Sequence, residues 1–284
     1  MSAVKFGVTY FPTDYAIPPA DLGRECEARG FESLWVAEHT HIPASRESPW
    51  PGGADLPQEY WHTLDPFVAL TAAAMVTTGL RVGTGIALVI QRDPIVLAKE
   101  VASLDHISGG RFLFGVGGGW NREEMRDHGT DPALRWGVLR ERIEAMKEIW
   151  TKDDAEYHGR YVDFGPMWSW PKPVQKPYPP ILVGGDGPNT FKRVVAYGDA
   201  WSPIVGRSSA TPFEDRLAEF RRYCEDHGRP GIPVTVYFVG RLDEEQLRRF
   251  AGLGVERLIC YVPPAGADQV IPRLDRYAEL LAKL

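Results

Sequence analysis

Residues 181–190 read Ile181-Leu182-Val183-Gly184-Gly185-Asp186-Gly187-Pro188-Asn189-Thr190, an apolar run that passes through three glycines into a helix-like segment. The run is continuously apolar rather than alternating, which is typical of strands covered on both faces in parallel sheets. Three glycines exceed what a plain turn needs, and glycine adopts backbone conformations that other residues avoid. The stretch therefore predicts one strand–turn–helix unit of a parallel α/β protein.

The same unit recurs along the chain. Short apolar runs alternate with amphipathic stretches, and we count eight runs, at Val4–Tyr10, Leu34–Ala37, Leu80–Ile90, Phe112–Val116, Ile181–Val183, Ala200–Val205, Val234–Val239 and Leu258–Val262. At about 35 residues per unit, eight strand-then-helix units fit a single parallel (β/α)₈ TIM barrel. An open doubly wound sheet is the alternative, and the absence of a GxGxxG motif after the first run disfavours it. No shift in composition marks a boundary, so residues 1–284 are expected to form one domain.

Several predicted helices have recognisable ends. Asp65-Pro66 and Asp93-Pro94 begin two of them, because Asp caps a helix and Pro suits its first turn. Gly109-Gly110 ends the second, since glycine takes the left-handed conformation easily. Further helices are predicted at Ala210–His227, Asp243–Leu253 and Asp268–Leu284.

Composition excludes several classes of protein. Of the 284 residues 44% are hydrophobic, and the net charge of −6 comes from interspersed charges, so no basic nucleic-acid surface is expected. Three widely spaced cysteines predict neither disulfides nor a zinc site, which suits a reducing cytosol. No leader-like N-terminus and no apolar run of ~18 residues is found, so we expect a cytoplasmic protein without a membrane partner.

Two long segments interrupt the alternation. Pro43–His62 follows the second strand and is polar and rich in Pro and Gly, and Glu156–Pro180 follows the fourth strand and holds two Trp and six Pro. Long loops in compact barrels are often functional. Both segments are expected to be loops.

The end of the second strand carries candidate catalytic side chains. It reads Val36-Ala37-Glu38-His39, and active sites of barrels lie at the carboxyl ends of the strands. Successive strand residues point to opposite faces, so a regular strand would bring Glu38 or His39, but not both, to the pocket. A His there can move a proton near neutral pH. The alternative is a surface His that holds the following loop.

Glycines mark the third and fourth strands. Gly83 and Gly85 flank Thr84 and precede Ile86, and glycine within a strand indicates either close approach of a ligand or tight packing between strands. The fourth strand continues into a glycine-rich stretch ending in Trp120 and Asn121. This stretch lacks the Gly-Lys-Ser/Thr ending of a P-loop, and its glycines could let the backbone turn under a flat ring.

The glycine turn quoted at the outset is the candidate anion site. Free N–H groups and the helix dipole favour an anion where a turn runs into a helix, here Gly184, Gly185, Asp186, Gly187, Pro188 and Asn189. An ordinary turn capped by Asn189 or Thr190 is the alternative. The sequence shows no metal-ligand spacing and no GxSxG elbow, so neither a metal nor a nucleophile mechanism is predicted.

Four segments together resemble the luciferase-like monooxygenase superfamily. They are Gly30–His39, Leu104–Arg111 running into Gly115-Val116-Gly117, Gly119–Glu124, and Pro171–Pro177 with Pro180–Gly185. The resemblance runs from Lys5 to about Val205 and continues more weakly to the C-terminus. Glu38-His39 at the end of the second strand, together with Gly119-Trp120-Asn121, looks most like F420-dependent (deazaflavin) members.

The resemblance implies a (β/α)₈ barrel with a flavin or deazaflavin at the top. It implies a non-proline cis peptide within Gly83–Ala87, at Gly85-Ile86, behind the cofactor ring, and a phosphate on the glycine turn. The residues expected to bind the ring are Thr84, Gly85, Ile86, Trp120 and Asn121. It also implies that His39 lies by the reactive ring carbon and that Glu38 tunes or orients it. Such barrels often form homodimers.

The chain departs from F420-dependent members at two places. Those members can carry a Trp shortly after the His, where this chain reads Thr40-His41-Ile42-Pro43, and a Glu after Gly-Val-Gly, where it reads Gly118-Gly119-Trp120. These differences leave the substrate and the proton donor open.

The resulting hypothesis is hydride transfer between coenzyme F420 and a small organic substrate. The cofactor supplies the ring chemistry, and the protein supplies orientation and a proton route. Two alternatives stay open: a two-component monooxygenase that uses reduced FMN, and a flavin- or deazaflavin-binding protein without turnover.

Overall fold

The sheet of this protein is a nearly closed parallel barrel. The structure is a computed structural model that describes residues 4–53, 55–206 and 211–283. Within these residues one sheet has the order β8-β7-β4-β3-β2-β1-β11-β10-β9, and its neighbouring strands pair in parallel. The strands are β1 Lys5–Tyr10, β2 Ser33–Val36, β3 Arg81–Thr84, β4 Phe112–Val116, β7 Ile181–Gly184, β8 Ala200–Ser202, β9 Ile204–Val205, β10 Thr235–Phe238 and β11 Arg257–Tyr261.

Strands β8 and β9 are two halves of one predicted strand, Ala200–Val205. Pro203 separates them, because a proline has no N–H for the strand ladder. Trp201 of β8 forms a parallel bridge with Val234 before β10, which brings the two ends of the sheet together. Counted as one strand, β8 and β9 complete eight strands, and the predicted (β/α)₈ barrel is confirmed.

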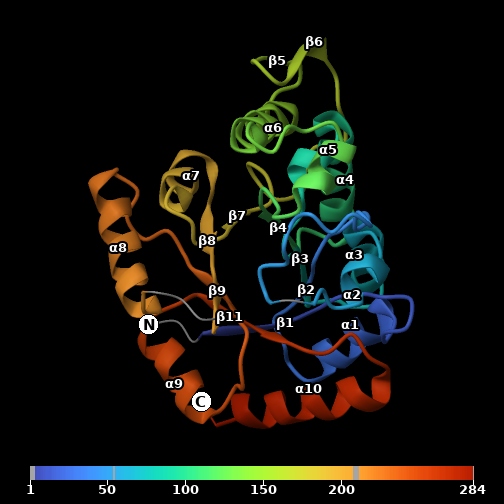
Figure 1. Cartoon of the computed structure of the whole chain (residues 1–284), viewed down its shortest axis with the longest axis vertical. Helices are drawn as coiled ribbons and strands as arrows, with labels where there is room; N and C mark the ends of the chain where they lie inside the picture. Colours follow the sequence, from blue (N-terminus) through green and yellow to red (C-terminus); the bar gives the residue numbers. More distant parts are fainter. Residues whose placement is uncertain (1–3, 54, 207–210, 284) are drawn as a thin grey trace.

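Helices surround the strands, as Figure 1 shows. They are α1 Pro19–Ala28, α2 Glu59–His62, α3 Pro66–Ala74, α4 Pro94–Ile107, α5 Arg122–Asp127, α6 Arg135–Thr151, α7 Thr190–Tyr197, α8 Phe213–Asp226, α9 Glu244–Gly252 and α10 Ala267–Leu281. Asp65 and Asp93 cap α3 and α4 as predicted, each accepting hydrogen bonds from two N–H groups of the first turn. The outer residues of two predicted helices, Ala210 and Leu284, lie outside the described residues.

The third strand is shorter than predicted. The sequence predicted a strand over Leu80–Ile90, but β3 ends at Thr84 and the chain turns into a short 3₁₀ helix at Val89–Gln91. The N–H of Leu88 donates to the Glu38 carboxylate at 2.6 Å instead of to a neighbouring strand. Strand pairing therefore cannot continue to Ile90.

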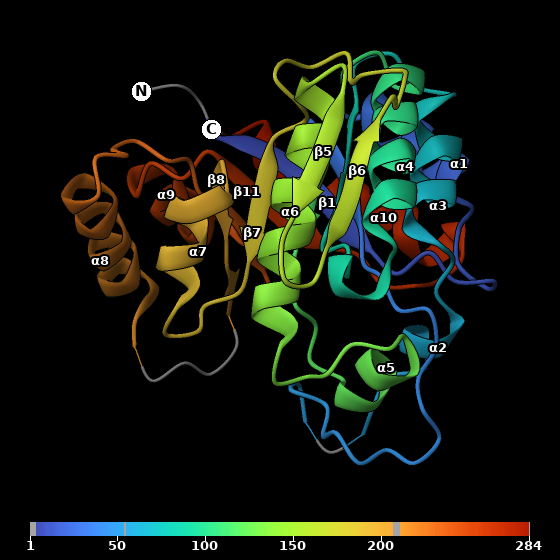
Figure 2. The ribbon, with the colours of Figure 1, turned by 90° about the horizontal axis from the view of Figure 1, so that it is seen from above.

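The segment Glu156–Pro180 is not a simple loop. Its first part belongs to an antiparallel hairpin of β5 Ala155–His158 and β6 Asp163–Met167, which lies outside the barrel against α6 (Figure 2). Glu141 of α6 accepts a hydrogen bond from the N–H of Tyr161 at 2.6 Å. The hairpin is held by a contact with a residue 20 positions earlier in the chain, which no local sequence pattern indicates. This is why the sequence predicted a loop here.

Large side chains close the middle of the barrel. Trp35 of β2 and Tyr237 of β10 meet edge to face with ring centroids 5.9 Å apart, beside Leu113, Leu182 and Ile259. A Cβ on Gly83 would lie 2.4 Å from the Trp35 ring. Glycine is thus required at Gly83 by packing between strands, one of the two interpretations that the sequence allowed.

None of the helices in the described residues is long and apolar enough to span a membrane.

Candidate active site

The main cavity opens where the strands end. Its volume is about 670 Å³, and its wall comes from residues that follow β1, β2, β3 and β4, from β9 to β11 and from the loop after β2. The lining residues are Thr9, Phe11, Ala37, Glu38, His39, Trp50, Pro51, Gly52, Pro57, Glu59, Tyr60, Gly85, Ile86, Leu88, Gly119, Trp120, Ile204, Tyr237, Phe238, Val239 and Tyr261. The cavity thus lies at the end of the barrel where the sequence predicted the site.

His39 is held on both ring nitrogens. Its Nδ1 lies 2.8 Å from Oε2 of Glu124, and its Nε2 accepts a hydrogen bond from the Trp120 indole at 3.3 Å. An indole N–H only donates, so Nε2 carries the lone pair and Nδ1 carries the proton toward Glu124. The side chains of His39 and Glu124 are 6% and 1% exposed, so water does not compete for their contact. His39 is therefore oriented with an unprotonated Nε2 in the cavity wall.

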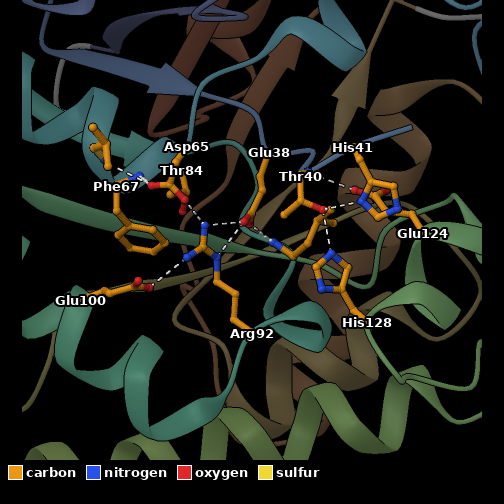
Figure 3. A network of polar contacts seen from close by, with 12 residues as sticks. Glu38, Thr40, His41, Asp65, Phe67, Thr84, Arg92, Glu100, Glu124 and His128 are labelled. Atoms are coloured by element: carbon orange, nitrogen blue, oxygen red, sulfur yellow. Dashed lines mark hydrogen bonds and ion pairs between the residues drawn. The ribbon is translucent and has the colours of Figure 1, made fainter. Parts of the chain in front are cut away.

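Glu38 also lines the cavity, but its partners lie behind the wall. Its Oε1 accepts from Arg92 Nε at 2.7 Å, and its Oε2 accepts from the N–H of Leu88. Burial raises the pKa of the Glu38 carboxyl, although the Arg92 guanidinium acts against this rise. Arg92 also contacts Asp65 and Glu100, as Figure 3 shows. Among the described residues, Glu38 forms no hydrogen bond to His39.

Glu124 takes the orienting place that the resemblance implied for Glu38. Its Oε1 also accepts from the N–H of Thr40 at 3.2 Å, so both carboxylate oxygens hold the end of β2. The sequence analysis missed Glu124 because it lies 85 residues from His39 along the chain. Asn121 could have indicated Glu124 from the sequence. An Asn followed three residues later by a Glu is typical of a helix start, and here that helix follows directly after the fourth strand.

The segment after β3 forms the floor of the cavity. The peptide Gly85-Ile86 is cis, as expected from the family resemblance. Gly85 and Ile86 line the cavity, whereas Thr84 is fully buried and donates to the carbonyl of Gly115 at 2.7 Å. A Cβ on Gly85 would lie 2.2 Å from the Tyr237 hydroxyl, so this phenol lies directly against the glycine.

Tyr237 is a second residue that the sequence analysis missed. It is 8% exposed and lines the cavity, and its hydroxyl has no hydrogen-bond partner among the described residues. Burial raises the pKa of this phenol well above its usual value, so it stays a donor. A buried unpaired hydroxyl is costly unless a ligand or water satisfies it.

The two remaining ring-site candidates have different surroundings. Trp120 lines the cavity and contacts His39. Asn121 is 2% exposed and accepts a hydrogen bond from the N–H of Glu124, so it caps α5 rather than lining the cavity. Its contribution to the site is to fix the helix that carries Glu124.

The predicted anion turn lies outside the cavity wall. Gly185 has a φ of +109°, and residues 185–189 are exposed before α7 begins at Thr190. Asp186 forms an ion pair with Arg216 at 2.9 Å, so it faces α8. The Asn189 side chain makes no capping hydrogen bond, so the alternative of a turn capped by Asn189 is wrong.

The loop Pro43–His62 forms the outer wall. The N–H of Ser48 donates to Glu123 Oε1 at 2.6 Å, and the Ser48 hydroxyl contacts the other oxygen of the same carboxylate. Burial would raise the pKa of Glu123, but these two bonds outweigh it and hold the pKa below its usual range. Figure 2 shows α2, which ends this loop, and α5 together at one end of the barrel. Adjacent carboxylates of α5 thus fix the loop and His39.

Comparison with known proteins identifies the family. The Luciferase-like monooxygenase family matches residues 18–281. The chain belongs to this family. An uncharacterised protein of Mycobacterium tuberculosis is 41% identical over 98% of both chains. The oxygenase component of a flavin-dependent trigonelline monooxygenase of Acinetobacter baylyi is 37% identical over 75% of this chain and 56% of that protein.

A solved structure shares the fold at lower identity. It is an F420-dependent secondary alcohol dehydrogenase in complex with an F420-acetone adduct, with a TM-score of 0.75, 17% identity and 98% of each chain covered. The proteins that this chain resembles thus include one described as F420-dependent and one described as flavin-dependent.

Proposed function

We propose that the protein transfers a hydride between coenzyme F420 and a small organic substrate in the cavity at the carboxyl end of the barrel. The observation that carries this proposal is the buried His39–Glu124 pair, with Nε2 of His39 unprotonated in the cavity wall. When a hydride leaves or reaches a substrate carbon that bears an oxygen or nitrogen, that heteroatom releases or takes up a proton, and a partner must accept or return it. His39 is the residue suited to that task.

Residues on the cavity floor fit a flat tricyclic ring. The Tyr237 hydroxyl is buried and without a partner among the described residues, so it can donate to a ring carbonyl or nitrogen. A Cβ on Gly117 would lie 2.0 Å from the Ile86 side chain, so glycine lets Ile86 lie flat beneath that ring. When bound, a deazaflavin supplies a ring carbon that gives or takes a hydride. The phosphate would lie on the turn Gly184–Asn189, at the start of α7.

The protein residues control the proton. To accept the proton that a substrate releases on oxidation, His39 Nε2 must first lose the hydrogen bond from the Trp120 indole, which uses its one lone pair; on reduction it returns a proton. Glu124 keeps the other nitrogen protonated and stabilises the positive charge on the imidazole while it holds two protons. Glu38 contributes by fixing the backbone at Leu88 through its bond to that N–H, and Arg92 keeps Glu38 in place.

A second candidate function has its own support. The relative of Acinetobacter baylyi is described as a flavin-dependent monooxygenase component and is 37% identical over its matched part. An FMN-dependent two-component monooxygenase would use the same floor and the same turn, because both cofactors carry a flat tricycle and a phosphate. A binding protein without turnover is the third candidate, and it would not need the His39–Glu124 pair.

The deciding experiment is titration of the purified apo-protein with F420 and with FMN, each oxidised and reduced, followed by fluorescence. We expect F420 to bind more tightly, and His39→Ala to abolish turnover while cofactor affinity stays within about threefold. Micromolar FMN affinity without F420 binding would replace the proposal by the monooxygenase. Turnover by His39→Ala at the wild-type rate would remove His39 from the chemistry.

A further inference from the structure

The outer half of the cavity is walled by aromatic rings. Tyr60 lies at its centre, with ring centroids 4.7 Å from Phe11, 5.7 Å from Trp50 and 6.2 Å from Trp120. The planes of Trp50 and Trp120 are inclined to Tyr60 by 72° and 76°, so the rings stand as walls at steep angles rather than as a stack. All four side chains line the cavity. Rings arranged in this way present their electron-rich faces in several directions, which suits a cation.

The charged side chains in the cavity wall are negative, which suits a cation. Among its described residues the lining contains the carboxylates of Glu38 and Glu59 and no Lys or Arg. Arg92 neutralises Glu38 from behind the wall. Glu59 has no ion pair among the described residues; it accepts a hydrogen bond from the Tyr261 hydroxyl, whose pKa is raised by burial and by this carboxylate. The uncompensated charge that faces the aromatic half is therefore negative.

The rings are held in place by the fold. A Cβ on Gly52 would lie 2.3 Å from the Trp50 indole, so this indole folds back on its own loop. The loop is fixed at Ser48 by Glu123, and α2 is fixed at His62 by Asp14 at 2.8 Å. A preformed set of walls loses little conformational entropy when a ligand enters.

We propose that the aromatic half of the cavity selects flat organic cations, such as N-alkylated pyridinium rings or protonated aromatic amines, through the faces of Trp50, Tyr60 and Trp120 and the carboxylate of Glu59. The inference rests on the proposed function only in placing a substrate in the same cavity. Anionic substrates are disfavoured because they would face the Glu59 carboxylate, and the described lining holds no Lys or Arg to offset that charge. Neutral rings of the same shape bind, but more weakly.

Two probes of equal shape and different charge test the proposal. N-methylpyridinium and toluene are matched in size, and their affinities for the full-length protein are measured by isothermal titration calorimetry, with benzoate as the anionic probe. We expect N-methylpyridinium to bind about tenfold more tightly than toluene, the scale of a cation–aromatic contact in a partly dry site. Glu59→Gln should reduce this preference about fivefold while leaving toluene unchanged.

A matched variant controls for net charge. Glu279→Gln makes the same change on the exposed face of α10 and should leave the preference intact. Trp50→Leu should lower the affinity for both probes, and the affinity for N-methylpyridinium should fall more than that for toluene. Equal binding of the two rings, tighter binding of benzoate, or an unchanged preference in Glu59→Gln would overturn the proposal. If the protein prefers the cation but binds no F420, the proposed cofactor is wrong and this inference stands. If it binds F420 without preferring the cation, the proposed cofactor stands and this inference is wrong.

Discussion

His39 Nδ1 lies 2.8 Å from Oε2 of Glu124, and the two side chains are almost completely buried. The contact joins the end of β2 to the first turn of α5, so two separate strand–helix units are required to make one proton-transfer group. Because Trp120 donates to the opposite ring nitrogen, the orientation of the imidazole is fixed at both ring nitrogens. Its consequences can be measured directly.

Removal of the Glu124 charge should lower turnover without altering the fold. For Glu124→Gln we expect kcat to fall about 10- to 100-fold with KM nearly unchanged, since the carboxylate acts on the proton transfer. In Glu124→Leu the kcat should fall further, and nitrogen NMR should show that the His39 proton is no longer held only on Nδ1. Asp127 on the same helix pairs with the exposed His41 and not with His39, so Asp127→Asn should behave as wild type. Normal kcat in Glu124→Leu would contradict the role.

Removal of the Tyr237 hydroxyl should affect cofactor affinity but not stability. Tyr237→Phe removes a buried hydroxyl that has no partner among the described residues, so Tm should be unchanged or slightly higher. Cofactor affinity should fall about fivefold to tenfold, corresponding to one lost hydrogen bond. The matched variant Tyr277→Phe loses a bond to the carbonyl of Tyr261 and should lower stability by about 1 kcal/mol without altering cofactor affinity. Unchanged cofactor affinity in Tyr237→Phe would place the ring elsewhere.

The glycine turn before α7 can be tested at Gly187. A Cβ there would meet nothing closer than 3.9 Å, so Gly187→Val should fold normally. We expect the affinity for F420 to fall at least about tenfold, because the side chain would cover the N–H groups that hold a phosphate. Gly165→Val lies in β6, where a Cβ is equally free, and serves as the control. Equal affinities of the two variants would rule out the turn as the phosphate site.

Acid stability should depend on the pair Glu32–Arg257 below the barrel. Both guanidinium contacts measure 2.7 Å, and Arg257 is 2% exposed. Burial alone would raise the pKa of Glu32, but Arg257 outweighs it and holds the pKa below the usual value of 4.5. The contribution is thus complete above that pH and is lost as the pH falls through the lowered folded-state pKa.

Glu32→Gln should accordingly reduce the free energy of unfolding by about 2 kcal/mol at pH 7, and by much less at pH 3. Urea unfolding at the two pH values measures the difference, with Glu279→Gln as the control. A loss of equal size at both pH values would mean that the charge of Glu32 is not what stabilises the pair.

We also expect a homodimer, formed through the outer faces of α3 and α4. These helices pack side by side, and Val68, Met75 and Val96 are 69%, 67% and 56% exposed there. Sedimentation should give a dimer, and the double variant Val68→Asp with Val96→Asp should give a monomer, because charge in an apolar interface costs several kcal/mol (about 2–5). Trp168→Asp, which alters an exposed apolar residue outside α3 and α4, should stay dimeric.

Local chemistry was sufficient to predict much of the fold from the sequence. Continuous apolar runs indicated buried parallel strands, and the Asp-Pro pairs located the starts of α3 and α4, because capping depends only on neighbouring residues. The position of His39 at a strand end followed from the same pattern. The family resemblance added the cis peptide at Gly85-Ile86.

Tertiary structure alone decided which residues meet. Glu124 reaches His39 across 85 residues, and Tyr237 reaches Gly85 across the barrel, because closure of the sheet brings opposite strands together. The Leu88 N–H bonds to Glu38 rather than to a neighbouring strand, a choice that no strand propensity encodes. The sequence by itself determined the strands, the caps and the strand end that carries His39, since these depend on contacts within a few residues; the partners of those residues depend on distances in space that only the closed barrel sets.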